Sequence, residues 1–245
     1  MQRGIVLDQF RNGLVSIVVP VHNKAKAKIC AEHVKKQTYQ NIELILVDFK
    51  GFPAEKRNYG YLKSKGEYVL FLDEDNYLSP TAISASVSKF NEGYDVVGIP
   101  AIKSIPRTYM AKCISITRLG EGNLLFFRRS VLQDVSLFNS EYALSDDLDL
   151  LIRVFSKGYR LGMVDPKEGY LIHDETNLMS SVIRKTLFAR KPYKNLQEKY
   201  GQVLDKLTRK PTERKRILKI LIHQPNLIPG VSFIMFVCFL ARRIP

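Results

Sequence analysis

Three consecutive acidic residues follow an apolar stretch and are the first candidates for chemistry. The stretch YVLFL ends at Leu72, and Asp73, Glu74 and Asp75 come directly after it. If the strand continues through them, Asp73 and Asp75 point to the same side while Glu74 faces elsewhere. Two converging carboxylates repel each other, and Mg²⁺ or Mn²⁺ would relieve that repulsion and stabilise the charge on a departing diphosphate. The alternative is a solvated acidic turn that caps the next helix.

A second acidic group begins the segment DDLDLLIRVFSKG, residues 146–158. Its apolar spacing and its final glycine predict a helix that ends at Gly158. Asp146 and Asp147 lie in the first turn, where capping alone would explain two acids. A carboxylate in such a place can also act as a general base. Asp149 lies one turn off that face, and we expect it to be structural.

The elements that position these acids alternate between strands and helices. Short apolar runs predict strands at 14–21, 42–49, 66–72, 94–102 and 159–164, and a strand that turns into a helix at 123–132. Amphipathic spacing predicts helices at 24–38, 53–65 and 80–90. This order predicts an α/β fold with a mixed, mostly parallel sheet and helices on both faces. Ligands bind beyond the carboxyl ends of the strands in such sheets, which is where Asp48 and Asp73 lie.

The length and composition indicate a folded chain with an appendage. The 245 residues are 45% hydrophobic and 25% charged, which is enough for a substantial core. Three widely spaced cysteines favour neither a disulfide framework nor a zinc site and indicate a reducing compartment. The first residues show no secretory signal. The composition changes near residue 180, so we expect a catalytic domain at 1–180 and a basic, helical and apolar region at 181–245.

The C-terminal region combines positive charge with an interrupted apolar segment. Residues 184–219 contain 13 Lys or Arg and 3 acids, most of the net charge of +14, which indicates a polyanionic partner. Residues 217–241 are apolar but interrupted, and a membrane span needs about 20 residues. An interfacial or re-entrant segment on an anionic membrane is favoured over nucleic-acid binding. A helix docked in the core or in a homo-oligomer interface is the alternative. We therefore expect the protein at the cytoplasmic face of a membrane, as a peripheral or monotopic protein.

Several motifs, in order, resemble one known family. They are VSIVVPVHN, KKQTYQNIELILVD, EKRNYGYLKSKGEYVLFLDEDNYLSP, GNLLFFRRSVL and SDDLDLLIRVFSKGYRL. Together they look like family 2 glycosyltransferases of the GT-A fold, over about residues 15–174. The resemblance implies an inverting, metal-dependent enzyme that moves a sugar from a nucleoside-diphosphate sugar to an acceptor hydroxyl. Given the C-terminal region, we expect that acceptor to be lipid-linked, a glycan, or otherwise presented at a membrane.

The resemblance also implies roles for individual residues of this sequence. For binding of the donor nucleotide it indicates Pro20, Asn23, Asp48, Arg57, Asn58 and Asp73. Asp73 and Asp75 match the family's metal-binding D-x-D motif, and some relatives use a histidine at the position of His173 as a further ligand for Mn²⁺. Otherwise a lone histidine is more often structural. Asp147 matches the carboxylate that serves as catalytic base in inverting members.

One departure from the family pattern affects recognition of the base. The family reads V-D-D-G-S-T-D after the second strand, whereas this chain reads VDFKGFPAEKRN, with Phe49 in place of the second acid. The donor base, uridine or guanosine, therefore stays open. Two other functions also remain possible at this stage. They are a nucleotide- or lipid-binding module without catalysis, and a nucleotidyltransferase of related fold, which would lack the usual Gly-rich, Lys-containing phosphate loop.

Overall fold

The computed structural model describes residues 10–103, 108–117, 123–142, 145–174, 179–208 and 211–243. Within these residues, eight strands form one mixed sheet in the order β2-β1-β3-β6-β5-β8-β4, and β7 pairs with β5. The strands are β1 (Arg11–Pro20), β2 (Ile42–Val47), β3 (Gly66–Phe71), β4 (Asn76–Leu78), β5 (Val96–Lys103), β6 (Asn123–Arg128), β7 (Leu161–Met163) and β8 (Leu171–His173).

Parallel pairing brings the carboxyl ends of β1, β2 and β3 to one edge of the sheet. β1 pairs in parallel with both β2 and β3, while β6 runs antiparallel between β3 and β5. β8 is parallel to β5 and antiparallel to β4. The mixed, mostly parallel sheet predicted from the sequence is therefore confirmed, with the antiparallel strands on the β6 and β4 side.

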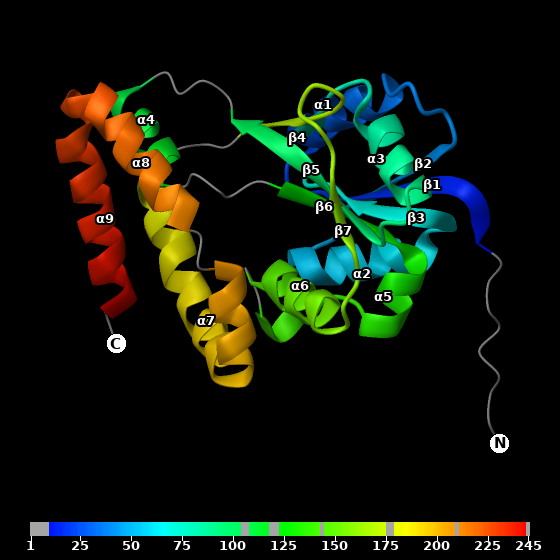
Figure 1. Ribbon diagram of the computed structural model, residues 1–245. Helices are drawn as coiled ribbons and strands as arrows, with labels where there is room; N and C mark the ends of the chain where they lie inside the picture. The colour runs from blue at the N-terminus through cyan, green and yellow to red at the C-terminus, as the bar shows by residue number, and fades with distance from the viewer. Residues whose placement is uncertain are drawn as a thin grey trace.

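Helices cover both faces of the sheet (Figure 1). α1 (Lys24–Lys35) and α3 (Ala82–Asn91) pack on one face, and α2 (Pro53–Lys63), α5 (Arg129–Val135) and α6 (Asp146–Ser156) pack on the other. Alternation along β1 explains the division, because Ile17 joins the first core and Val18 joins the second. Both residues are fully buried.

The remaining helices form a group at the side of the sheet. They are α4 (Tyr109–Thr117), α7 (Met179–Thr208), α8 (Pro211–His223), a 3₁₀ turn at Pro225–Leu227 and α9 (Ile228–Arg243). Cys113 and Ile114 of α4 share a small apolar core with Val231 and Ile234 of α9. α7 joins the sheet layer through Leu196, which packs near α6. The expected C-terminal helices are thus present, and their inner faces are docked on the preceding part of the chain.

The C-terminal helices are individually too short or too polar for a membrane span, as far as the structure describes them. Among the described residues, no single helix is long and apolar enough to cross a membrane. The pair Ile217–His223 and Pro225–Leu240 reaches the required length and composition only when combined, and the two parts meet at a bend of 113°.

Some elements differ from the sequence-based predictions. β2 is an edge strand in which only Val47 is buried, so the prediction of a strand buried on both faces is wrong there. Asp73–Asp75 lie in a turn between β3 and β4, so the strand alternation assumed for these acids does not apply. β8 follows β7, which we had expected to be the last strand, because pairing with β4 and β5 stabilises a run too short to be recognised alone.

α2 lies so close to the sheet that a side chain larger than that of Gly60 should lower stability. A Cβ atom on Gly60 would lie 2.2 Å from Cγ1 of Val18, inside the buried core. Gly60→Ala should therefore lower the free energy of unfolding by about 1–3 kcal/mol, because α2 must move away from β1. Gly201→Ala is the matched control, since a Cβ there meets nothing within 4 Å and stability should stay constant or rise by up to about 1 kcal/mol. Equal stability of both variants in urea denaturation would contradict this packing.

Candidate active site

Arg57 connects two acids from distant parts of the chain. Its Nη2 donates to Oδ1 of Asp73 at 2.7 Å, and its Nη1 donates to Oδ2 of Asp146 at 2.9 Å. Asp73 follows β3, whereas Asp146 begins α6. The guanidinium also lies over the ring of Phe138, with its Cζ 5.2 Å from the ring centroid. A planar, permanently charged group with several N–H donors is suited to holding two carboxylates in this way.

Two of the three charges in this bridge, those of Arg57 and Asp146, are largely removed from solvent, whereas Asp73 is partly exposed. Burial lowers the pKa of Arg57, but the charges of Asp73 and Asp146 outweigh that effect and raise it above its ordinary value. Burial raises the pKa of Asp146, and the charge of Arg57 opposes this rise without cancelling it. Arg57 is therefore a permanent cation that partly compensates the cost of burying Asp146.

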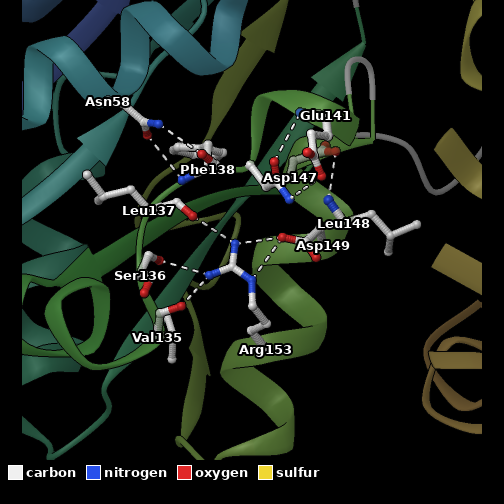
Figure 2. Close-up of polar contacts among 11 residues, drawn as sticks. Asn58, Val135, Ser136, Leu137, Phe138, Glu141, Asp147, Leu148, Asp149 and Arg153 are labelled. Atoms are coloured by element: carbon white, nitrogen blue, oxygen red, sulfur yellow. Dashed lines mark hydrogen bonds and ion pairs between the residues drawn. The ribbon is translucent and has the colours of Figure 1, made fainter. Parts of the chain in front are cut away.

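Two side chains, Arg153 and Asn58, hold the backbone of residues 135–138, which run from the end of α5 toward α6 (Figure 2). The guanidinium of Arg153 donates to the backbone carbonyls of Val135, Ser136 and Leu137 and pairs with Asp149 at 2.7 Å. The expected structural role of Asp149 is confirmed by this pair.

Asn58 holds the same segment from α2. Its amide donates to the carbonyl of Phe138 at 2.8 Å and accepts from the N–H of Phe138 at 3.0 Å (Figure 2). Asn58 was expected to lie near the nucleotide. The structure gives its side chain a scaffolding contact, which supports the ring beneath Arg57.

Asp147 lies beside the Arg57 bridge in the first turn of α6, and solvent reaches its side chain. Its Oδ1 accepts from the N–H of Leu148 at 2.8 Å (Figure 2). Surrounding protein raises the pKa of Asp147, and repulsion from Asp146 adds to this, while Arg57 acts in the opposite direction. An accessible carboxylate with a raised pKa is a suitable proton acceptor.

The expected metal ligands lie in two groups. Antiparallel pairing of β4 with β8 sets Asn76 opposite His173, and Nε2 of His173 is 3.7 Å from Oδ2 of Asp75. Asp73, by contrast, is engaged by Arg57. Across the described parts of the chain, no three His, Cys, Asp or Glu side chains are grouped closely enough to hold an ion by themselves.

The donor set nevertheless fits a hard divalent cation. Asp75 and His173 supply oxygen and imidazole donors side by side, which suit Mg²⁺ or Mn²⁺ in type, while Oδ1 of Asp73 accepts from Arg57. Mg²⁺ and Mn²⁺ sites commonly use few protein ligands, with water and substrate phosphates completing the coordination. The assignment of Asp73, Asp75 and His173 as ligands stays a prediction.

The loop after β1 is held by Glu74 and Lys56, for which the sequence had suggested no role. The carboxylate of Glu74 accepts from the backbone N–H groups of His22, at 2.6 Å, and Asn23, at 2.8 Å. From the other side, the buried ammonium of Lys56 donates to the carbonyl of Val21 and lies 3.2 Å from Nδ1 of His22. The sequence signal was present, since Glu74 is the middle acid of the motif and Lys56 directly precedes the R-N pair.

Pro20, Asn23 and Asp48, which are expected to bind the nucleotide, lie near this loop and make different contacts. Pro20 ends β1, and the side chain of Asn23 caps α1 by accepting from the N–H groups of Ala25 and Lys26. Asp48 follows β2 and forms an exposed pair with Lys24 at 3.1 Å, which contributes little to stability. Next to Asp48, Phe49 and Tyr59 meet edge to face, with 5.7 Å between ring centroids. Both rings are exposed and present apolar surface beside the carboxyl end of β2.

A sequence profile described as glycosyl transferase family group 2 matches residues 68–238, well over half of the chain. The chain belongs to this family. The match includes the acidic turn, α6 and most of the C-terminal helices.

Two curated relatives agree with this family. The glycosyltransferase GlyG of Streptococcus pneumoniae serotype 4 is 33% identical over 32% of this chain and 36% of that protein. An uncharacterised glycosyltransferase of Haemophilus influenzae is 34% identical over 27% of this chain and 31% of its own length. The matched part thus spans about a third of each relative.

Two solved structures share the fold. The mannosyltransferase PcManGT from Pyrobaculum calidifontis, in complex with GDP-Man and Mn²⁺, is 15% identical with a TM-score of 0.57, covering 96% of this chain and 77% of that one. TarS 1–349 of S. aureus, in complex with UDP, is also 15% identical with a TM-score of 0.53, covering 94% and 89%. At these identities the likeness establishes the fold of the GT-A type.

The charge of Arg57 should contribute to the stability of the fold, because it compensates a buried acid. Arg57→Leu should lower the free energy of unfolding at neutral pH by about 3–5 kcal/mol, because Asp146 is left buried without its counter-charge. Arg57→Lys should recover only part of this, since a single ammonium cannot hold both carboxylates in the same geometry.

The pH dependence of the stability deficit of Arg57→Leu separates the effect of charge from that of packing. Asp146 already has a raised pKa, and loss of Arg57 raises it further. The deficit of Arg57→Leu should therefore be greatest at neutral pH and shrink as the pH falls through that pKa and the carboxyl group becomes neutral. The free energy of unfolding of both proteins, measured by urea denaturation between about pH 4 and about pH 7, tests this expectation. This range begins near the ordinary pKa of aspartate. A deficit that does not vary with pH would mean that lost packing, rather than charge, is responsible.

Proposed function

We propose that the chain is an inverting, metal-dependent glycosyltransferase that moves a sugar from a nucleoside-diphosphate sugar to an acceptor hydroxyl. The observation that carries this proposal is the exposed Asp147 beside the buried Arg57–Asp146 pair, at the side of the acidic turn. Membership of glycosyl transferase family group 2 supports the same reaction class.

The proposed base chemistry follows from the surroundings of Asp147. The carboxylate removes the proton from the acceptor hydroxyl as that oxygen attacks the anomeric carbon. The bond from the anomeric carbon to the diphosphate oxygen breaks on the opposite face, so the configuration inverts and a nucleoside diphosphate leaves. The raised pKa of Asp147 makes its carboxylate a better proton acceptor than an ordinary surface aspartate. Arg57 keeps the neighbouring Asp146 in place without occupying Asp147.

The donor would lie along the carboxyl ends of β1 and β2. The loop held by Glu74 and Lys56 borders the nucleotide, and the exposed rings of Phe49 and Tyr59 offer apolar surface to the base next to Asp48. Asp73, Asp75 and His173 would hold Mn²⁺ or Mg²⁺ together with the diphosphate. Such a cation supplies stabilisation of the charge that develops on the leaving group.

The role of Asp147 is tested by Asp147→Asn. Sugar transfer should fall by about a hundred- to ten-thousand-fold, because the acceptor loses its proton acceptor. Binding of nucleoside diphosphate should stay within a factor of about two, since the amide keeps the size of the side chain. Single-turnover transfer and calorimetric titration measure the two effects.

Glu141→Gln is the matched control for this test. It removes an exposed carboxylate of the neighbouring 3₁₀ turn and should leave transfer unchanged. Unchanged transfer in Asp147→Asn, or an equal loss in both variants, would remove Asp147 from the mechanism.

The metal site is tested by Asp75→Asn and His173→Gln. Each should weaken Mn²⁺ binding in the presence of UDP or GDP by at least about tenfold, because one of few protein ligands loses its donor strength. Calorimetry with Mn²⁺ titrated into the protein–nucleotide complex gives the affinity without reliance on activity. Glu168→Gln, an exposed acid beyond β7, is the control and should bind Mn²⁺ like the unaltered chain. Undiminished affinity in both site variants would disprove this ligand set.

A further inference from the structure

α9 is apolar on two opposite faces. Its inner face carries Val231 and Ile234, which are buried against α4 and α7. The outer face carries Phe233, Met235, Phe236, Phe239 and Leu240, all of which are exposed. Residues three and four apart share one side of a helix, so these side chains form a continuous apolar surface with Phe236, at 57% exposure, near its centre. A surface helix of a globular protein ordinarily has polar residues on that side.

α8 continues this pattern with charge added. Leu218 and Ile222 are four residues apart and are 60% and 68% exposed. Lys215 and Lys219, also four apart, are exposed on the same helix. Figure 1 shows α8 and α9 together at the end of the molecule away from β2, with α9 outermost. We call the exposed apolar residues of α8 and α9 the C-terminal apolar surface.

The surrounding charge selects the kind of partner. Further exposed cations lie on α7, among them Arg184, Lys191 and Lys194. A second copy of the chain would bring two molecules of net charge +14 together at their most basic ends, which electrostatic repulsion opposes. Nucleic acid would satisfy the cations but would leave the exposed apolar surface of α9 in contact with water. Anionic lipid satisfies both, because acyl chains accept the aromatic groups while headgroups pair with lysine and arginine.

The dimensions of α9 favour a helix that lies in the interface. Its 16 residues give a length of about 24 Å, shorter than the roughly 30 Å hydrocarbon core of a bilayer. Its inner face is already docked on α4 and α7, so only the outer face can enter lipid. We propose that the C-terminal apolar surface inserts into the headgroup–acyl boundary of an anionic membrane while the rest of the chain stays outside the bilayer.

This placement brings the active site toward the membrane. β8 ends at His173, parallel to β5, and the next described element is α7 of the C-terminal group. Figure 1 shows the arrowhead of β5 directed toward α4 and α8. The carboxyl ends of these two strands therefore lie on the side of the sheet that faces the lipid-binding helices. The consequence, which rests on the proposed function, is that the acceptor hydroxyl belongs to a molecule anchored in that membrane.

The absence of tryptophan from the chain makes a direct test possible. Phe236→Trp introduces the single indole at the centre of the C-terminal apolar surface. Its fluorescence should shift to shorter wavelength when vesicles of phosphatidylcholine with phosphatidylglycerol are added, and lipids brominated along the acyl chain should quench it. Phosphatidylcholine vesicles alone should give a smaller shift, and the binding to anionic vesicles should weaken as salt screens the lysines.

Leu62→Trp is the matched control. Leu62 is 72% exposed on α2, far from the C-terminal group in the sheet layer, and its indole should show neither shift nor quenching. In a flotation assay, Phe233→Glu combined with Phe236→Glu should lower the bound fraction at least tenfold, whereas Leu62→Glu should leave it unchanged. No shift for Phe236→Trp, or equal shifts at both positions, would overturn the proposal.

Two further measurements separate the other outcomes. If the surface instead binds a second copy, sedimentation velocity should show a dimer that the Phe233→Glu, Phe236→Glu variant dissociates, and this result would refute lipid insertion. Hydrolysis of the nucleotide sugar in solution reports on the active site alone. A protein that inserts into vesicles but never cleaves a donor would disprove the proposed function and support the membrane surface. A protein that cleaves a donor but does not insert would disprove only the membrane surface.

Discussion

The arrangement of the candidate active site depends on one buried guanidinium. Arg57 is the shared partner of Asp73, which follows β3, and Asp146, which begins α6. These two acids belong to the acidic turn and to the first turn of α6, so the bridge fixes the distance between these two segments. Without a cation in this position, two carboxylates near Asp147 would repel one another in surroundings that screen charge poorly. The pKa of Asp147 stays raised by its surroundings and by the charge of Asp146, because Arg57 only partly opposes these two effects.

Packing around Arg57 makes this charge arrangement rigid. Gly60 allows α2 to approach β1, Phe138 lies beneath the guanidinium, and Asn58 holds the backbone of Phe138 in both directions. Arg153 fixes the preceding residues through their carbonyl groups. Asn58 of the R-N pair and Arg153, which follows the SDDLD motif, thus form hydrogen bonds mainly with backbone groups. Their hydrogen bonds hold residues 135–138 against α2 and α6, while Arg57 holds the first turn of α6 through Asp146.

The fold could be predicted from the sequence wherever a pattern was local and long. β1, β3, β5 and the helices α1, α2 and α6 were expected within a few residues of their observed ends, because each has a clear apolar period. β8 was missed, since three residues carry no period and are held by pairing with β4 and β5. The burial of β2 was overestimated for a related reason: an apolar run does not reveal whether a strand lies at the edge of a sheet.

The sequence by itself indicated a glycosyltransferase through ordered motifs that resemble family 2. It also pointed to the acids worth testing, because carboxylates after buried strands or at the start of a helix can bind metal ions or accept protons. Only the tertiary structure decided how these residues are shared. It joins Asp73 to Arg57 rather than to Asp75, assigns Asn58 and Asn23 to backbone contacts, and shows that one face of α9 is docked while the other is exposed. The physical reason is that ion pairs and packing join residues far apart in sequence. Arg57 and Asp146 are 89 positions apart, and a pattern read along the chain contains no information about such contacts.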